Sequence, residues 1–155
     1  MSLEHLWVFL ISAAPISELR GGIPTGLFEF DLSWYSVFLV SFLGNLLPVP
    51  FLLLCLDPLS RLLSKIEIFG RILEWLFERT RRRGSIVERH GRIGLTLFVA
   101  LPLPVTGAWT GALVAFLLGM EFKHAFLSIV LGVFIAGVIV TSFCLAGWQA
   151  YLWLR

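Results

Sequence analysis

Residues 102–111, which read PLPVTGAWTG, place two prolines and two glycines in the middle of a long apolar run. The run covers residues 93–120 and contains no charged side chain, so it is long enough to cross a bilayer core of ~30 Å. Prolines and glycines interrupt helices and leave backbone N–H and C=O groups without partners. Hydrocarbon cannot satisfy those groups, so broken backbone at membrane depth is buried in protein or lines a wet cavity. We therefore expect a broken helix here and treat it as a candidate binding site.

The composition of the whole chain favours a membrane setting. Of its 155 residues, 58% are hydrophobic and only 14% are charged, and the mean hydropathy is +0.91. Soluble domains carry about 25% charged residues, so the sequence predicts an all-α integral membrane protein that forms one domain. It contains no zinc or haem spacing, no phosphate-binding glycine loop and no nucleophile elbow. We therefore expect no catalytic residues, no metal site and no cofactor.

A second broken block and two full spans complete the apolar pattern. Residues 3–30 form an apolar block that is interrupted by APISELRGGIP at residues 14–24. Each flank of this block has about a dozen residues, too few to cross ~30 Å at 1.5 Å per residue. Residues 34–56 and 122–146 each suit a full transmembrane helix, and Pro48 and Pro50 should bend or break the first of them.

The segment between the two apolar halves is basic. Nine of the twelve Lys and Arg residues lie between Arg61 and Arg92. Apolar residues recur at helical spacing between residues 66 and 77, which predicts an amphipathic helix lying on anionic headgroups; a solvated loop is the alternative. The basic patch at the end of this helix consists of Arg79, Arg81, Arg82 and Arg83. We divide the chain into half 1 (residues 1–57), this linker helix (58–91) and half 2 (92–155).

The two halves resemble each other in sequence. At an offset of 89, Pro15, Ile16, Ser17 and Gly22 match Pro104, Val105, Thr106 and Gly111. At an offset of 88, SFLG at residues 41–44 matches IVLG at residues 129–132. Each half is thus predicted to be a broken hairpin followed by one full span.

Two topologies fit this repeat. Basic residues favour the cytoplasmic side of a membrane, which places the linker helix there. If both broken blocks are re-entrant hairpins, the first enters from the outside and the second from the cytoplasm. The halves then form an inverted repeat, whose interface commonly holds a transport site near the midplane. The alternative is four ordinary spans with parallel repeats, and the charge distribution fits both.

Glu18 and Arg20 are the strongest candidates for function. Both lie among helix breakers in the middle of an apolar block. A charge at membrane depth costs about 2.5–3.5 kcal/mol on insertion scales, so it pairs with another group or faces a cavity. Glu18 could carry a proton, and Arg20 could clamp an anion such as a phosphate headgroup. The alternative is a salt bridge that fixes the hairpin and has no other role.

The second broken block offers only neutral groups: two threonine hydroxyls, a tryptophan N–H, freed backbone and the positive dipole ends of half-helices. Alternatively, its prolines only kink a helix whose threonines bond back to the backbone. Asn45, in the core of the first span, suits packing and ligand binding equally. The candidate substrate or ion pathway consists of Glu18, Arg20, Pro24, Asn45, Pro102, Pro104, Thr106, Gly107, Trp109 and Thr110.

Three motifs carry a resemblance to a known family: ELRGGIP at residues 18–24, NLLPVPF at 45–51 and PLPVTGAWTGAL at 102–113. Together they resemble the small multidrug export protein family, which is grouped with the DedA superfamily of membrane proteins. The resemblance implies two re-entrant hairpins that face each other from opposite leaflets. It also implies proton-linked transport, or movement of phospholipids or polyprenyl phosphates, with functional acidic and arginine residues near the hairpins. Only Glu18 and Arg20 match that character, because the second hairpin departs from the pattern by carrying no charge.

We therefore expect a small exporter that holds its substrate between the two hairpin tips and exposes it alternately to each side. The expected substrate is a drug or an amphipathic or anionic, lipid-phosphate-like molecule, with coupling to protons through Glu18 as an option. A non-transporting scaffold or chaperone-like membrane protein is the alternative, because it needs the fold but not the charge pair. The expected partners are the bilayer and its anionic headgroups, with a homo-oligomer left open and no nucleic acid. The expected location is the plasma or inner membrane, with residues 58–92 cytoplasmic.

Overall fold

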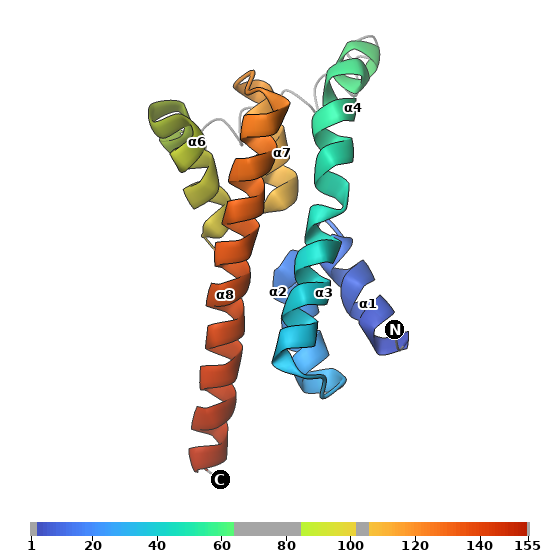
Figure 1. Ribbon diagram of the computed structural model, residues 1–155, viewed down its shortest axis with the longest axis vertical. Coiled ribbons are helices and arrows are strands. Elements are labelled where there is room, and N and C mark those ends of the chain that lie inside the picture. Colours follow the sequence, from blue (N-terminus) through green and yellow to red (C-terminus); the bar gives the residue numbers. More distant parts are fainter. Residues whose placement is uncertain (1–2, 64–84, 102–105, 155) are drawn as a thin grey trace.

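The structure is a computed structural model that describes residues 3–63, 85–101 and 106–154. The described residues form helices and no strand, as predicted. In chain order the helices are α1 (Leu3–Ala13), α2 (Glu18–Pro24), the π-helix η1 (Thr25–Glu29), α3 (Trp34–Leu46), α4 (Pro48–Leu63), α6 (Ser85–Ala100), α7 (Ala108–Leu117) and α8 (Phe122–Leu154) (Figure 1). Pro102, Pro104, the predicted linker helix between residues 64 and 84 and its basic patch (Arg79, Arg81, Arg82, Arg83) lie outside the described residues.

Two helical stretches are long and apolar enough to cross a membrane. α3 and the first part of α4 form one of them, Trp34–Cys55, and most of α8 forms the other, Phe122–Gly147. α3 and α8 pack against each other and run in opposite directions (Figure 1). Both predicted full spans are therefore present as helices of sufficient length.

The first span is interrupted where its prolines predict. α3 ends at Leu46 and α4 begins at Pro48, because a proline has no N–H to donate into the preceding turn. The predicted span, residues 34–56, agrees with the apolar stretch Trp34–Cys55, and α4 continues beyond it to Leu63. The charge at Asp57 ends the apolar surface of the helix, but it does not interrupt the backbone hydrogen bonds.

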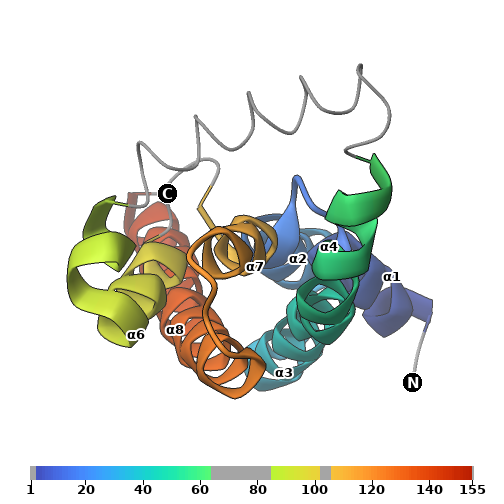
Figure 2. The same cartoon turned by 90° about the horizontal axis from the view of Figure 1, so that it is seen from above.

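The shorter helices form two hairpins. α1 and α2 make the first, which η1 extends, and α6 and α7 make the second. The hairpins come from opposite ends of the molecule, and their turns lie at about the same level halfway along it (Figure 1). α1 has 11 residues and α7 has 10, so each is ~15–17 Å long, about half of a bilayer core. Seen from above, α2 and α7 lie between the spans, with α1 and α6 at the outer edges (Figure 2).

α6 begins at Ser85, earlier than the predicted start of the second apolar block at residue 93. Its regular backbone is interrupted at Gly91, which has φ 53° and ψ −120°. A positive φ of this kind is costly for residues with a side chain, so glycine permits the bend. The part of α6 after this bend matches the predicted apolar flank.

Each half contains a glycine that brings a hairpin helix against the following span. A Cβ placed on Gly44 of α3 would lie 2.5 Å from the backbone oxygen of Phe9 in α1. A Cβ placed on Gly132 of α8 would lie 2.8 Å from the backbone oxygen of Thr96 in α6. Gly44 and Gly132 are an equivalent pair in the sequence comparison of the halves. The same small residue therefore makes the same kind of backbone contact in both halves.

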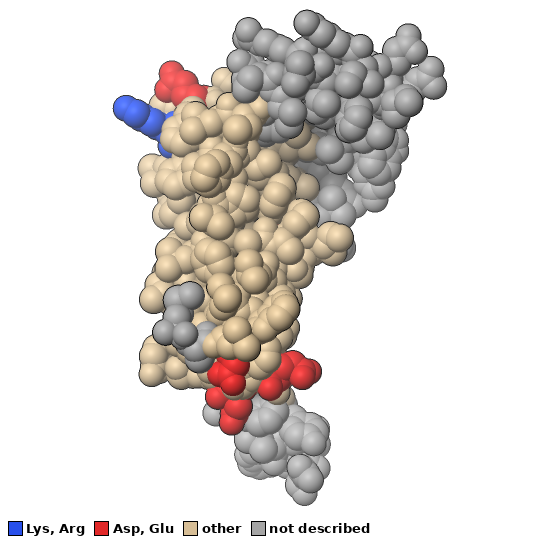
Figure 3. Space-filling model, turned by 90° about the vertical axis from the view of Figure 1, so that its right-hand side faces the viewer, with Lys and Arg blue, Asp and Glu red and all other residues tan. Residues whose placement is uncertain are grey.

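The exposed charges gather at the two ends of the molecule. On the face shown in Figure 3, acidic and basic side chains mark the ends, and an uncharged belt lies between them. Large apolar side chains of the spans, such as Leu43, Phe51 and Leu127, are more than half exposed. An exposed apolar patch of this extent on a monomer marks a surface that meets lipid or another protein. With two apolar spans, it supports a location in the membrane.

Candidate functional site

The first tip, residues 14–22, turns the chain from α1 into α2. Pro15 has no N–H, so it cannot bond the carbonyl of Ile11 and continue α1. The Ser17 hydroxyl donates to that carbonyl instead, at 2.6 Å. Glu18, the first residue of α2, then adopts a positive φ of 48°. That backbone costs a non-glycine residue about 1–3 kcal/mol, so the contacts of Glu18 must hold it in place.

The Glu18 carboxylate reaches across to the second tip, which comprises residues 101–111 and is described at residues 101 and 106–111. It accepts hydrogen bonds from the backbone N–H groups of Ala108 and Trp109. These groups begin α7 and have no partner within the helix. The Glu18 side chain, only 7% exposed, therefore caps a helix in the other half of the molecule, where the helix dipole favours a negative charge.

Gly107 makes this contact possible. A Cβ placed on Gly107 would lie 1.8 Å from Oε2 of Glu18 and 2.4 Å from its Oε1. No side chain fits at that distance, so the carboxylate lies directly against the backbone of residue 107. The glycine that looked like a helix breaker in the sequence has a more specific role, which is to admit the charged group of the opposite tip.

Arg20 donates hydrogen bonds to the other interrupted part of the second tip, between the end of α6 and Thr106. Its guanidinium donates to the backbone oxygen and, at 3.2 Å, to the hydroxyl of Thr106, and it donates to the backbone oxygen of Leu101 at 3.3 Å. Leu101 directly follows α6, where carbonyls lack partners within the helix and the dipole is negative. The Thr106 hydroxyl also donates to the Leu101 oxygen at 2.7 Å. Glu18 and Arg20 thus satisfy the start of α7 and the end of α6, respectively.

The second tip returns one such contact to the first. The Trp109 indole N–H donates to the backbone oxygen of Ala13, the last residue of α1, at 3.2 Å. The Thr110 hydroxyl donates to the Gly107 oxygen at 3.3 Å, a bond within its own tip. Each tip therefore supplies partners for the broken backbone of the other.

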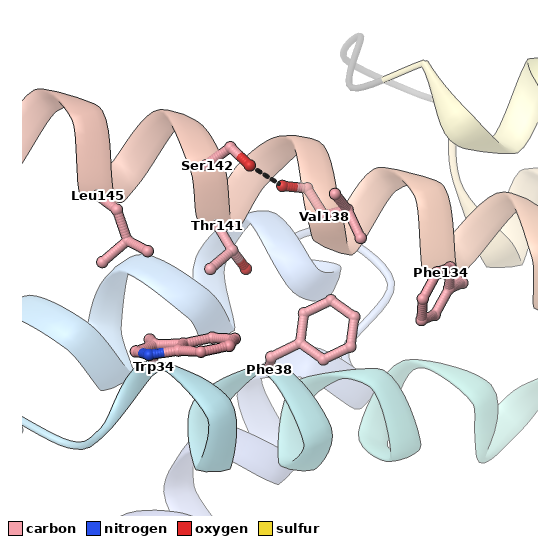
Figure 4. Close-up of a pocket in the computed structure, with 7 residues that line it drawn as sticks. All are labelled: Trp34, Phe38, Phe134, Val138, Thr141, Ser142 and Leu145. Atoms are coloured by element: carbon pink, nitrogen blue, oxygen red, sulfur yellow. Dashed lines mark hydrogen bonds between the residues drawn. The ribbon is translucent and has the colours of Figure 1, made fainter.

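A separate pocket of about 310 Å³ lies between α3 and α8. Its volume is at the lower end of the range for small-molecule sites, roughly 300–1,000 Å³. Figure 4 shows Thr141 and Phe134 of α8 pointing toward Trp34 and Phe38 of α3. The Thr141 hydroxyl is buried and has no hydrogen-bond partner. Val138, Ser142 and Leu145 complete the lining, which is mostly apolar.

Comparison with protein families gives one match. The profile of the family described as "Putative small multi-drug export protein" matches residues 18–139. The chain belongs to this family. The match begins at Glu18 within the first tip, includes the first span and the second tip, and ends within the second span at residue 139; the family name favours an export role over catalysis. Searches of curated proteins and of solved structures found no match.

Five residues of the predicted pathway meet at the contact between the tips, namely Glu18, Arg20, Thr106, Gly107 and Trp109. Thr110 lies beside them in α7. Pro24 ends α2, six residues after Glu18, and no contact places it at the tips. Asn45 is buried in α3, and its Oδ1 has no hydrogen-bond partner. The predicted pathway is thus partly one cluster and partly spread along half 1.

The sequence interpretation missed two kinds of group. The carbonyls of Ala13 and Leu101 accept hydrogen bonds across the tips, and no sequence pattern identifies a backbone oxygen as a partner. The second kind is a set of hydroxyl residues in apolar helices: Ser12, Ser41 and Thr141 are buried, and their oxygens have no partner; Ser12 and Ser41 each stand alone between apolar residues. Their isolation among apolar neighbours was a signal that could have been used.

Proposed function

We propose that this protein is a small membrane exporter whose two hairpins are re-entrant and related as an inverted repeat. Three observations support this: the half-length hairpin helices, the opposite directions of the two spans, and the matching glycine contacts in the two halves. The nine basic residues between Arg61 and Arg92 favour a cytoplasmic location for this segment, in a plasma or inner membrane. The same two-hairpin arrangement is what a relation to the DedA proteins implies, so that relation is part of the proposal.

Cysteine labelling tests this topology. In whole cells, Asp31→Cys should react with a membrane-impermeant maleimide added outside, and Glu121→Cys should react only after the cytoplasmic side is opened. Both positions are exposed and lie outside the two spans or at their ends. Labelling of both residues from the outside would instead support four ordinary spans, because a second block that crosses the membrane puts residue 121 outside.

The observation that carries the proposed mechanism is the capping of the second tip by Glu18 and Arg20. In this contact the two tips meet about halfway along the molecule (Figure 1). When they separate, the Arg20 guanidinium and the N–H groups of Ala108 and Trp109 give up the hydrogen bonds that they make between the tips. All three favour an anion, so a phosphate or similar group could take their place. The site between the tips would then suit an anionic headgroup.

Glu18 would control this exchange. An ionised Glu18 occupies the N–H groups that the anion needs, so anion and carboxylate compete for them. A proton taken up by the Glu18 carboxylate weakens its charge-assisted hydrogen bonds and favours separation of the tips. Release of that proton favours closure. Such an exchange would couple export to the uptake and release of a proton by Glu18.

The pocket between α3 and α8 would receive the apolar part of the substrate. It is lined by aromatic and aliphatic side chains, and it lies on the surface of the two spans (Figure 4). An anionic headgroup and an apolar body together describe an amphipathic substrate. A lipid phosphate therefore fits the two sites better than a cationic drug.

Transport in proteoliposomes tests the function. We expect flux of a fluorescent anionic phospholipid, and little flux of a cationic dye. Glu18→Gln keeps the size of the side chain but cannot ionise, and Arg20→Ala removes the guanidinium; both should lower flux at least about tenfold. Glu29→Gln, at an exposed carboxylate outside the tips, is the matched control and should transport normally.

A scaffold role is the competing function, because Glu18 and Arg20 have partners within the protein and could serve the fold alone. A folded wild-type protein with no flux of any probe would favour the scaffold. Normal flux in Glu18→Gln would contradict the role of Glu18 while leaving export intact. Circular dichroism of each variant shows whether a loss of flux is a loss of fold.

A further inference from the structure

Three buried oxygens in half 1 have no hydrogen-bond partner: Ser12 Oγ in α1, and Ser41 Oγ and Asn45 Oδ1 in α3. Their residues are at most 1% exposed. A buried polar group without a partner is costly, and neither water nor lipid reaches these side chains from the surface. Three such groups in one half of a small protein call for a shared explanation.

Two of these oxygens, those of Ser12 and Ser41, lie against one point of α2. A Cβ placed on Gly22 would lie 1.8 Å from Ser12 Oγ and 3.1 Å from Ser41 Oγ, so the two oxygens are less than about 5 Å apart. Asn45 follows Ser41 by four residues and lies on the same face of α3. The cluster therefore joins three helices directly behind the first tip.

The equivalent place in half 2 is apolar. Gly111, the counterpart of Gly22, packs against Val99 and Ile129. Ile129 corresponds to Ser41 at the offset of 88, and Val133 corresponds to Asn45. Val99, Ile129 and Val133 are all at most 1% exposed. Aliphatic side chains thus fill this position in the same packing arrangement, so the fold does not require polar groups there.

We propose that Ser12, Ser41 and Asn45 bind a small monovalent cation such as Na⁺. Each offers an oxygen lone pair, the type of ligand that hard cations take. Ser12 lies in the last turn of α1, where the helix dipole is negative, and such half-helix ends bind Na⁺ in transporters. The charged groups of Glu18 and Arg20 are both directed to the second tip, so the three neutral oxygens form the site by themselves.

This site goes beyond the proposed export function, because it binds the cation whatever the protein transports. Within that function it would supply a second coupling ion beside the proton on Glu18. Only this consequence rests on the proposed function. Binding is measured without transport, so the two can fail separately.

Thermal unfolding of the full chain in nanodiscs tests the site. NaCl replaces choline chloride stepwise at constant ionic strength, and circular dichroism gives Tm. We expect a saturable rise of about 3–6 °C at a Na⁺ concentration tenfold above half-saturation. Ser12→Ala and Ser41→Ala should each raise the half-saturating concentration about 10–100-fold. Ser128→Ala removes a buried hydroxyl of α8 outside the cluster and should leave the Na⁺ response unchanged.

The triple variant Ser12→Val, Ser41→Ile, Asn45→Val copies the core of half 2 and should fold without any Na⁺ response. A wild-type Tm that is the same in Na⁺ and choline overturns the proposal and leaves water as the partner of these oxygens. A Na⁺ response that persists unchanged in Ser12→Ala, Ser41→Ala and the triple variant also overturns it, because the cation then binds elsewhere.

Discussion

The two hairpin tips are related in sequence, yet they present opposite kinds of chemistry. The first tip carries two ionisable side chains, Glu18 and Arg20, on a turn where the carbonyls of Ala14 and Ser17 accept hydrogen bonds from N–H groups of the same tip. The second tip carries no charged side chain, but it exposes the start of α7 and the end of α6. The side-chain charges of one tip match the partial charges of the helix ends in the other.

This difference shows that the tips are two parts of one site and not two copies of the same site. Glu18 caps N–H groups and Arg20 caps carbonyls, so the order of charges along the first tip matches the order of helix ends along the second. A duplicated hairpin with the same charges could not make this contact with itself. The loss of charge from one tip is therefore a condition for closing the pair.

The largest expected effect is at the closest contact between the tips. Gly107→Ala should place a methyl group on the Glu18 carboxylate and force the tips apart, at a cost of about 2–3 kcal/mol. Thermal unfolding should show a fall in Tm of about 4–12 °C. Gly147→Ala is the matched control, because nothing lies within 4 Å of its new Cβ. Glu18→Ala should recover part of the stability of Gly107→Ala; if it does not, the carboxylate is not what the methyl group meets.

Removal of the guanidinium should have the next largest effect. Arg20→Ala leaves the Thr106 and Leu101 oxygens without their charged donor, and we expect a loss of about 1.5–3 kcal/mol in the free energy of unfolding. Arg20→Lys keeps the charge but cannot reach several acceptors with one planar group, so its stability should lie between those of wild type and Arg20→Ala. Equal stability of Arg20→Lys and wild type would show that only the charge matters.

The hydrogen bond that the Trp109 indole donates to the first tip should contribute less to the free energy of unfolding. Trp109→Phe removes the hydrogen bond to the Ala13 oxygen but keeps an aromatic ring, so we expect a loss of about 0.5–1.5 kcal/mol. Urea or thermal unfolding measures the change. A double-mutant cycle with Arg20→Lys should show coupling between the two sites, because both close the same contact. Strictly additive losses would indicate that the two bonds form independently.

The smallest expected effects come from two threonine variants, one that removes a contact between the tips and one that removes a contact within one tip. Thr106→Val removes a hydroxyl that both accepts from Arg20 and donates to Leu101. Thr110→Val removes one 3.3 Å bond within the second tip. We expect a loss of about 1 kcal/mol for the first and about 0.5 kcal/mol or less for the second. A larger loss for Thr110→Val would contradict the view that the contact between the tips holds this region together.

Local composition predicted where the helices are interrupted, but not which residues contact these interruptions. Pro15 and Pro48 end helices because each lacks an N–H group, an effect that depends on one residue alone. The positions of these helix ends could therefore be predicted directly from the sequence. The partnership of Glu18 with α7 depends on a residue about ninety positions away, and two apolar halves can be docked in many ways. The sequence therefore identified Glu18, Arg20 and Thr106 as important without showing that they bond across the tips.

The extent of the first span could be predicted from charge alone, because residues 34–56 agree with the apolar stretch Trp34–Cys55. A charge such as Asp57 marks where the apolar surface stops, and the backbone of α4 continues past it to Leu63. Conversely, Ser12 and Ser41 look unremarkable in an apolar run, because serine is common in membrane helices and can bond its own backbone. Only their position beside Gly22 shows that these hydroxyls have no such partner.

The capping of one half by the other also bears on how the protein is made. When Glu18 and Arg20 leave the ribosome, α7 is still about ninety residues from synthesis, a delay of roughly 5–20 s. During that time Glu18 and Arg20 lack the partners that they have in the second tip, and a charge at membrane depth costs about 2.5–3.5 kcal/mol. We expect the nascent first hairpin to wait at the membrane surface or within the insertion machinery. Its integration into the bilayer would then be completed only when the second hairpin arrives.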